Sequence, residues 1–119
     1  MKLVYIAGPY NAPTDWEREQ NIWRAKEAGA RVVLCGAYPV VPHSNTANYG
    51  GLAQEEFFYA GTMALLEVCH GCVLLPGWRR SKGASAEEAR ASALGMRIFS
   101  SNEEADWDAL TEWAATRTP

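Results

Sequence analysis

The stretch from Leu74 to Glu87 constrains the fold of this chain more than any other. The apolar run from Cys72 to Leu75 shows no alternation, which is typical of a strand covered on both faces in a parallel sheet. Pro76 and Gly77 end that strand, and a helix rich in small residues follows. Because ligands of open α/β sheets bind outside the carboxyl ends of the strands, we expect a binding site in this loop.

The loop and the start of this helix carry groups that favour an anion. Ser81, Gly83 and Ser85 are candidate N-terminal residues of the helix, where free backbone N–H groups and the helix dipole attract phosphate. The densest group of positive charges in the chain lies in the same loop: Arg79, Arg80 and Lys82. A formal net charge of −3 gives no support for a nucleic-acid polymer, so these residues indicate a small anionic ligand.

Glu87 lies in the middle of an arc of apolar and small side chains when the helix is drawn at about 100° per residue. Leu94, Ile98 and Ala91 flank it in that projection. An inward carboxylate is costly unless it has a partner or a chemical role. Two interpretations remain open: Glu87 is a functional group, or it stabilises the first turn of its own helix or pairs with Arg90.

The rest of the chain alternates strands and helices. We predict strands at residues 2–7, 31–35, 72–75 and 97–100. We predict helices from Thr14 or Asp15 to Gly29, from Gln54 to Val68, from Ser81 onwards, and from Ser101 or Asn102 to about Ala115. This order implies an α/β fold in a single domain over residues 1–119, a three-layer sandwich with a mostly parallel sheet, flavodoxin-like or Rossmann-like.

Two connecting segments and one helix face carry further expectations. Residues 36–42 continue the second strand as extended chain, and residues 43–51 form a polar, glycine-rich loop. The apolar stripe of the helix at 54–68 is formed by Phe57, Phe58, Gly61, Leu65 and Val68.

Three loops then meet at one edge of the sheet, over residues 8–14, 41–51 and 77–83. Tyr5 lies near the end of the first strand, where it either faces this crevice or packs in the core. His43 in the second loop either takes part in the site or hydrogen-bonds a backbone carbonyl. The chain lacks the motifs of serine hydrolases, P-loop kinases, zinc proteases and ordinary dinucleotide enzymes.

The cysteines indicate neither a metal site nor a redox pair. Three cysteines, an odd number, are typical of a reducing compartment, and we expect a cytoplasmic protein. Cys69 and Cys72 run from a helix end into a strand, which favours buried structural thiols. Only Cys35 and His43 remain as distant metal ligands, so we predict no metal and no cofactor. No segment is apolar enough for a signal peptide or a membrane span, and we expect no membrane association.

Three motifs in this order resemble the nucleoside 2-deoxyribosyltransferase-like superfamily, most closely its short bacterial and phage members of the DUF4406 type. They are Tyr5-Ile6-Ala7-Gly8-Pro9-Tyr10, Pro42-His43-Ser44-Asn45, and Leu75-Pro76-Gly77-Trp78 followed by residues 81–87. The resemblance runs from about Lys2 to Phe99. It implies that Glu87 is the nucleophile and that Tyr5 lies close to it. The substrate-binding residues that we expect from these motifs are Gly8, Pro9, His43, Asn45, Gly77, Trp78, Ser81 and Gly83.

The resemblance implies cleavage of an N-glycosidic bond, or exchange of the base, on a nucleoside or nucleoside 5′-monophosphate through a glutamate glycosyl-enzyme. Ser81 and Gly83 are implied to hold the 5′ end or its phosphate. Many members carry acids where this chain has Thr62 and His70, which leaves open how the departing base is protonated. The candidates for that role are His43, Glu55, Glu56 and a water. The alternative functions are a non-catalytic nucleotide-binding module with the same crevice, and an interaction protein.

Trp16 and Trp23 recur at seven-residue spacing, away from the helix face that should meet the sheet. Large exposed aromatics often mark interfaces, and members of the superfamily are commonly oligomers that share their sites. We therefore expect a homodimer or larger homo-oligomer that uses this helix. The alternative is that the N-terminal loop or the terminal helix covers both rings within one chain.

Overall fold

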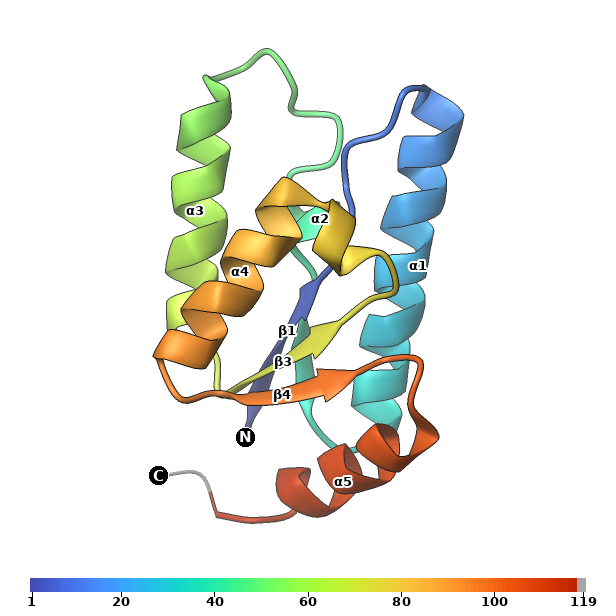
Figure 1. Cartoon of the computed structure of the whole chain (residues 1–119), viewed down its shortest axis with the longest axis vertical. Coiled ribbons are helices and arrows are strands. Elements are labelled where there is room, and N and C mark those ends of the chain that lie inside the picture. Colours follow the sequence, from blue (N-terminus) through green and yellow to red (C-terminus); the bar gives the residue numbers. More distant parts are fainter. Residues whose placement is uncertain (118–119) are drawn as a thin grey trace.

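The computed structural model describes residues 1–117, so the last two residues of the predicted domain lie outside it. Within that range one parallel sheet contains β1 (Leu3–Ala7), β2 (Tyr38–Val40), β3 (Gly71–Leu74) and β4 (Arg97–Ser100), in the order β2-β1-β3-β4. The helices are α1 (Asp15–Leu34), α2 (Pro42–Asn45), α3 (Glu55–Glu67), α4 (Lys82–Ala93) and α5 (Glu104–Ala114), with a short 3-10 helix η1 (Trp78–Arg80). Helices cover both faces of the sheet (Figure 1), which confirms the predicted α/β sandwich.

The two faces of β1 divide the core into two clusters. Val4 and Ile6 pack with residues of α1 and α5, whereas Tyr5 and Ala7 pack with residues of α3 and α4. Because the strand is buried on both faces, its sequence does not alternate between apolar and polar residues. The side chain of Tyr5 is thereby directed into the layer that carries α4.

The predicted strand at Arg31–Cys35 is wrong, because these residues continue α1 and then cap it. Val32 is fully buried on the same helix face as Ala28, and this burial outweighs the β preference of a β-branched side chain. Gly29 does not end the helix but lets it approach the next strand, since a Cβ there would lie 2.8 Å from Cγ2 of Val41. The strand β2 lies in the segment predicted only as extended chain.

Two boundaries also differ from the prediction. The segment expected as a loop over residues 43–51 begins with the short helix α2. The terminal helix α5 starts after Glu103 rather than at Ser101 or Asn102. The side chain of Asp106 accepts a hydrogen bond of 2.6 Å from the backbone N–H of Ser100, and this contact ties α5 to the end of β4.

The predicted apolar stripe of α3 is only partly correct, because Leu65 packs against the core cluster around Cys72 whereas two other members are exposed. Phe57 and Val68 are 68 % and 63 % exposed, whereas Leu66, which was not in the stripe, is fully buried. The helix therefore meets the rest of the molecule through the face that contains Leu66. The aromatic residues of α3 made the wrong face look apolar in the sequence. Only tertiary contacts decide which face of a helix is covered.

Trp16 and Trp23 remain uncovered within the chain, with exposed fractions of 73 % and 61 %. The aromatic residues of α5 lie elsewhere: Trp107 is buried and Trp113 packs against Phe99 at a ring-centroid distance of 5.4 Å. Neither the N-terminal loop nor α5 hides the two rings. No helix among the described residues is long and apolar enough to cross a membrane.

Candidate active site

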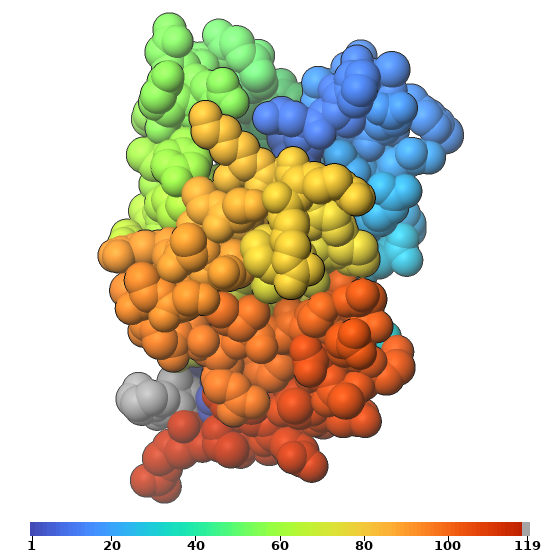
Figure 2. All heavy atoms as spheres, viewed as in Figure 1, coloured from blue at the N-terminus to red at the C-terminus, as the bar shows by residue number. Residues whose placement is uncertain are grey.

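A hollow of about 1490 Å³ lies at the carboxyl ends of β1 and β3. Its walls come from the loops after these strands, from α1 and α3, and from the start of α4. Figure 2 shows the surface notched between α3 and the beginning of α1, at the end of the molecule where the hollow lies. Its volume exceeds the range of about 300–1,000 Å³ typical of small-molecule sites, so a nucleotide-sized ligand fits.

Glu87 of α4 and Tyr5 of β1 meet at this hollow. Glu87 lines it while remaining only 8 % exposed, and the hydroxyl of Tyr5, itself fully buried, donates a hydrogen bond to Oε2 of Glu87. The helix begins with Ser81 as its N-cap, and Glu87 lies near its middle on the face that also buries Ala84 and Ala91. The inward orientation predicted from the helical arc is present.

Burial changes the acidity of both groups in this pair. Loss of solvation raises the pKa of Glu87 to about 7, and the hydrogen bond from Tyr5 acts in the opposite direction. Burial, reinforced by the nearby Glu87, also raises the pKa of the Tyr5 phenol, which therefore stays protonated as a donor. The site holds a carboxylate that ionises near neutral pH beside a fixed hydroxyl.

Two glycines allow the loops after β1 and β3 to come together. A Cβ on Gly8 would lie 2.6 Å from Cβ of Leu75, so no other residue fits between these strand ends. Gly77 adopts a φ of +85°, a left-handed conformation that glycine reaches without strain, and it faces the ring of Pro9. Both glycines and Pro9 line the hollow, as the motifs predict.

His43 connects α2 to the loop after β1 through hydrogen bonds. Its Nε2 lies 3.0 Å from the carbonyl oxygen of Gly8 and 3.1 Å from that of Pro9. Two acceptors at one nitrogen require the proton on Nε2, and burial lowers the pKa of the ring, so His43 is neutral. Its Nδ1 is a buried side-chain atom without a partner in the described chain. His43 lines the hollow, but its only proton is already used to position backbone.

The start of α4 presents donors to the hollow. The hydroxyl oxygen of Ser81 accepts from the N–H of Ala84 at 3.2 Å, which leaves the hydroxyl hydrogen free. Lys82 and Gly83 follow in the first turn, where backbone N–H groups have no partner within the helix. The cationic side chains of Arg80 and Lys82 border the same space. This end of the hollow suits a phosphate group.

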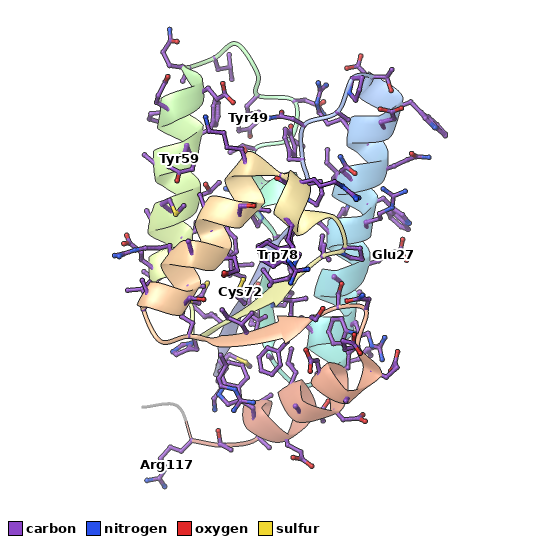
Figure 3. The ribbon with its side chains drawn as sticks, in the orientation of Figure 1. Glu27, Tyr49, Tyr59, Cys72, Trp78 and Arg117 are labelled. Atoms are coloured by element: carbon purple, nitrogen blue, oxygen red, sulfur yellow. The ribbon has the colours of Figure 1, made fainter. Side chains whose placement is uncertain are left out.

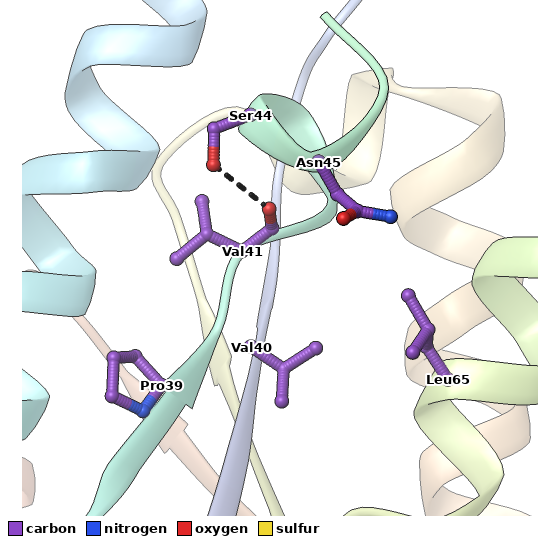
Figure 4. A pocket seen from close by; sticks show the side chains of 6 residues that line it. All are labelled: Pro39, Val40, Val41, Ser44, Asn45 and Leu65. Atoms are coloured by element: carbon purple, nitrogen blue, oxygen red, sulfur yellow. Dashed lines mark hydrogen bonds between the residues drawn. The ribbon is translucent and has the colours of Figure 1, made fainter.

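The structure separates two motif residues from Glu87. Asn45 lines another, smaller pocket of about 330 Å³ beside β2, where its side chain extends toward α3 and Leu65 (Figure 4). Trp78 packs against the core cluster around Cys72, with the Arg79 guanidinium 4.6 Å from its ring centre, and does not line the hollow (Figure 3). The helical turn α2 and the 3-10 turn η1 redirect these side chains, and neither turn was visible in the sequence pattern.

The two positions at which family acids were expected have different surroundings. Thr62 lines the hollow near the Tyr5 hydroxyl, where it opposes the rise in the pKa of Tyr5, and its own hydroxyl donates to the carbonyl oxygen of Tyr59 at 2.9 Å. His70 precedes β3 at the amino end of the sheet, where its Nδ1 accepts from the N–H of Leu3 at 2.9 Å. The His70 side chain therefore stabilises this end of the sheet and does not contribute to the site.

The sequence pattern does not single out several residues that line the hollow, among them Asn21, Arg24 and Tyr59. The amide of Asn21 donates to the carbonyl of Tyr10 at 3.2 Å, which turns this part of α1 toward the loop after β1. A polar line at helical spacing beside the buried face of α1 was the available signal. Among the described residues no group of three or more histidine, cysteine or acidic side chains is arranged to hold a metal ion.

Comparison with known proteins agrees with this architecture. Residues 2–100 match the family model described as a domain of unknown function, DUF4406, and the chain belongs to that family. The fold resembles that of the 2-desoxiribosyltransferase from Leishmania mexicana, with a TM-score of 0.62 and 17 % sequence identity. The alignment covers 84 % of this chain and 63 % of the Leishmania chain, so the present chain spans less than two thirds of that protein. No curated protein matches the sequence.

Proposed function

We propose that this protein cleaves the N-glycosidic bond of a nucleoside or nucleoside 5′-monophosphate, or exchanges its base, with Glu87 as the nucleophile. The observation that carries the proposal is the buried Tyr5–Glu87 hydrogen bond at the edge of the hollow. A carboxylate with a pKa of about 7 is poised to ionise at working pH, and such groups concentrate at functional sites. The fold shared with a deoxyribosyltransferase supports the same reaction class.

In the proposed first step an oxygen of the Glu87 carboxylate attacks C1′ of the sugar as the bond from C1′ to the base nitrogen breaks. The base leaves with the bonding electron pair and takes up a proton from water. Water or a second base then attacks C1′, gives up a proton to solvent and releases Glu87 as the carboxylate. Tyr5 keeps the carboxylate oriented throughout, because its hydroxyl stays protonated.

The start of α4 supports a 5′-phosphate on the substrate. Free N–H groups, the Ser81 hydroxyl and the side chains of Arg80 and Lys82 lie at one end of the hollow that Glu87 lines. Neither Arg80 nor Lys82 takes part in an ion pair within the described chain. A dianionic phosphate provides the missing counter-charge.

Incubation of the wild type and Glu87→Gln with a panel of nucleosides and monophosphates, with and without a second free base, tests the proposal. Chromatography follows the released base, the free sugar and any new nucleoside. Release of base with free sugar identifies a hydrolase, and a new nucleoside identifies a transferase. Substrate binding without base release by the wild type would contradict catalysis and favour the nucleotide-binding module.

We further propose a homodimer or larger homo-oligomer in which α1 contributes to the contact. The exposed rings of Trp16 and Trp23 on this helix support it, since large uncovered aromatics are costly in water. The oligomer is a separate proposal from the reaction.

A further inference from the structure

We propose that α3 forms the base side of the hollow and that Glu55 accepts a hydrogen bond from an exocyclic amino group of the base. The preferred substrates are then nucleotides of amino-bearing bases, such as cytosine or adenine, over their carbonyl counterparts. This inference rests on the proposed function, because it names the base that the same site takes.

One face of α3 leads from the reacting groups to Glu55. Leu66, Thr62, Tyr59 and Glu55 follow one another at spacings of three or four residues, so they lie on one side of the helix. Leu66 is fully buried in the core cluster around Tyr5, which fixes this side as the inward one. Thr62 contacts the Tyr5 hydroxyl, and Thr62, Tyr59 and Glu55 all line the hollow.

The distance along this face matches the length of a nucleobase. Glu55 and Thr62 are seven positions apart, and a rise of 1.5 Å per residue puts them about 10 Å apart along the axis. A nucleobase whose glycosidic bond lies beside Tyr5 and Glu87 spans most of that length, and one hydrogen bond spans the rest. Tyr59 lies between these two residues along the helix and lines the hollow, where a base can stack on its ring.

The charges in the hollow give the substrate one orientation. Arg24, Arg80 and Lys82 come from α1, η1 and α4, whereas Glu55 comes from α3, which stands across from α1 (Figure 1). A phosphate is drawn to the cations, which leaves the base for α3. A carboxylate accepts from an amino group and repels a carbonyl oxygen, as in protein readout of the cytosine amino group.

Glu55 has no ion-pair or hydrogen-bond partner in the described chain, so it is available to a ligand. Its neighbour Glu56 borders the hollow too, but lies about 100° round the helix from the line through Thr62 and Leu66. Glu56 is therefore a matched control: the same side chain, one position along, with a different direction.

The test uses two matched pairs of ligands, CMP with UMP and AMP with IMP, each in ribo and 2′-deoxy form. Calorimetric titration of Glu87→Gln measures binding, and base release by the wild type measures turnover. We expect the amino-bearing member to bind about ten- to a hundredfold more tightly, the range for one hydrogen bond to a charged group. Glu55→Gln should lose this preference, because an amide also donates to a carbonyl, whereas Glu56→Gln should retain it.

The outcomes separate the two proposals. Equal affinity for both members of each pair, or loss of preference in Glu56→Gln but not in Glu55→Gln, would overturn the role of Glu55 and leave the proposed function standing. A parallel loss of affinity for all ligands in Glu55→Gln would indicate a purely structural residue and would also overturn it. Failure of every nucleotide to bind or react would overturn the proposed function itself, and the inference with it.

Discussion

The phenol of Tyr5 on β1 donates a hydrogen bond to the carboxylate of Glu87 on α4, across 82 positions of sequence. Both side chains are buried, and Glu87 lines a hollow at the carboxyl ends of β1 and β3. Burial raises the pKa of Glu87 to about 7 while the Tyr5 hydroxyl holds it down. A carboxylate that needs only a small pH change to ionise, beside a donor that cannot itself ionise, is suited to nucleophilic attack.

Replacement of Glu87 by glutamine should abolish base release and leave the fold intact, because the amide keeps the shape and accepts from Tyr5 but is a poor nucleophile. A slow 2-fluoro-arabinosyl substrate should label the wild type, and mass spectrometry should place the sugar on the peptide that contains Glu87. Glu88→Gln is the matched control on the next residue of α4. Label on another residue, or full activity in Glu87→Gln, would rule out the assignment.

The same substitution should change how stability depends on pH. The pKa of Glu87 is raised on folding from 4.5 to about 7, so between these values the folded state holds a proton that the unfolded state has lost. The wild type should therefore lose about 3 kcal/mol of unfolding free energy relative to Glu87→Gln as the pH rises from 4 to 8. Denaturant titrations of both proteins across this range measure the difference. A constant difference would mean that Glu87 ionises normally.

Tyr5→Phe should move the pH profile of kcat/KM. In the wild type the rate should rise with pH through an inflection near 7, as Glu87 becomes ionised. The hydrogen bond from Tyr5 lowers the pKa of Glu87, so its removal should shift the inflection to higher pH and reduce the rate at neutral pH. An inflection that moves to lower pH, or stays in place, would contradict this role for the hydroxyl.

Ser81→Ala should weaken the binding of a monophosphate more than the binding of the matching nucleoside. The hydroxyl that caps α4 through Ala84 also faces the hollow, and a lost hydrogen bond to a charged group costs about 1.5–3 kcal/mol. Michaelis constants for both substrates measure the difference. Thr14→Ala, which removes the equivalent cap of α1, is the control for a general loss of helix stability of about 1 kcal/mol. Equal effects on both substrates would leave Ser81 as a helix cap only.

Trp16→Glu combined with Trp23→Glu should dissociate the oligomer. Both rings are exposed on α1, and two carboxylates in their place would be desolvated in any interface that they form. Light scattering at micromolar concentration should give a multiple of the chain mass for the wild type and a lower mass for the variant. A wild-type mass of one chain would refute the oligomer, and an unchanged mass in the variant would place the interface elsewhere.

Local patterns were sufficient for the inward direction of Glu87, whereas its pairing with Tyr5 was implied only by the resemblance to the superfamily. The unbroken apolar run of β3, the loop after it and the spacing of small residues in α4 all lie close together in sequence. They were enough to predict a parallel sheet and an inward Glu87, and helical geometry carries that inference without tertiary information. Local patterns also placed Tyr5 near the end of the first strand, but left open whether it faces the crevice or packs in the core.

Side chains in turns and on exposed helices could not be placed in this way. Asn45 and Trp78 belong to recognisable motifs, yet the turns α2 and η1 direct them away from the hollow. Glu55 was one of several candidate acids, and only the burial of Leu66 on the same face of α3 shows that it borders the hollow. The sequence around Val32 predicts a strand, and only the burial of this side chain shows that it belongs to a helix.

The sequence by itself determined the class of the fold, the order of most of its elements and the identity of the carboxylate at its centre. Those properties depend on the side-chain periodicities of strands (two residues) and helices (3.6 residues). Such periodicities are visible among residues that are close together in the sequence. Tertiary structure alone decided the true extent of α1, the inward face of α3 and the members of the hollow. These depend on contacts such as Gly29 with Val41 and Leu66 with the cluster around Tyr5, which join residues whose proximity no local pattern encodes.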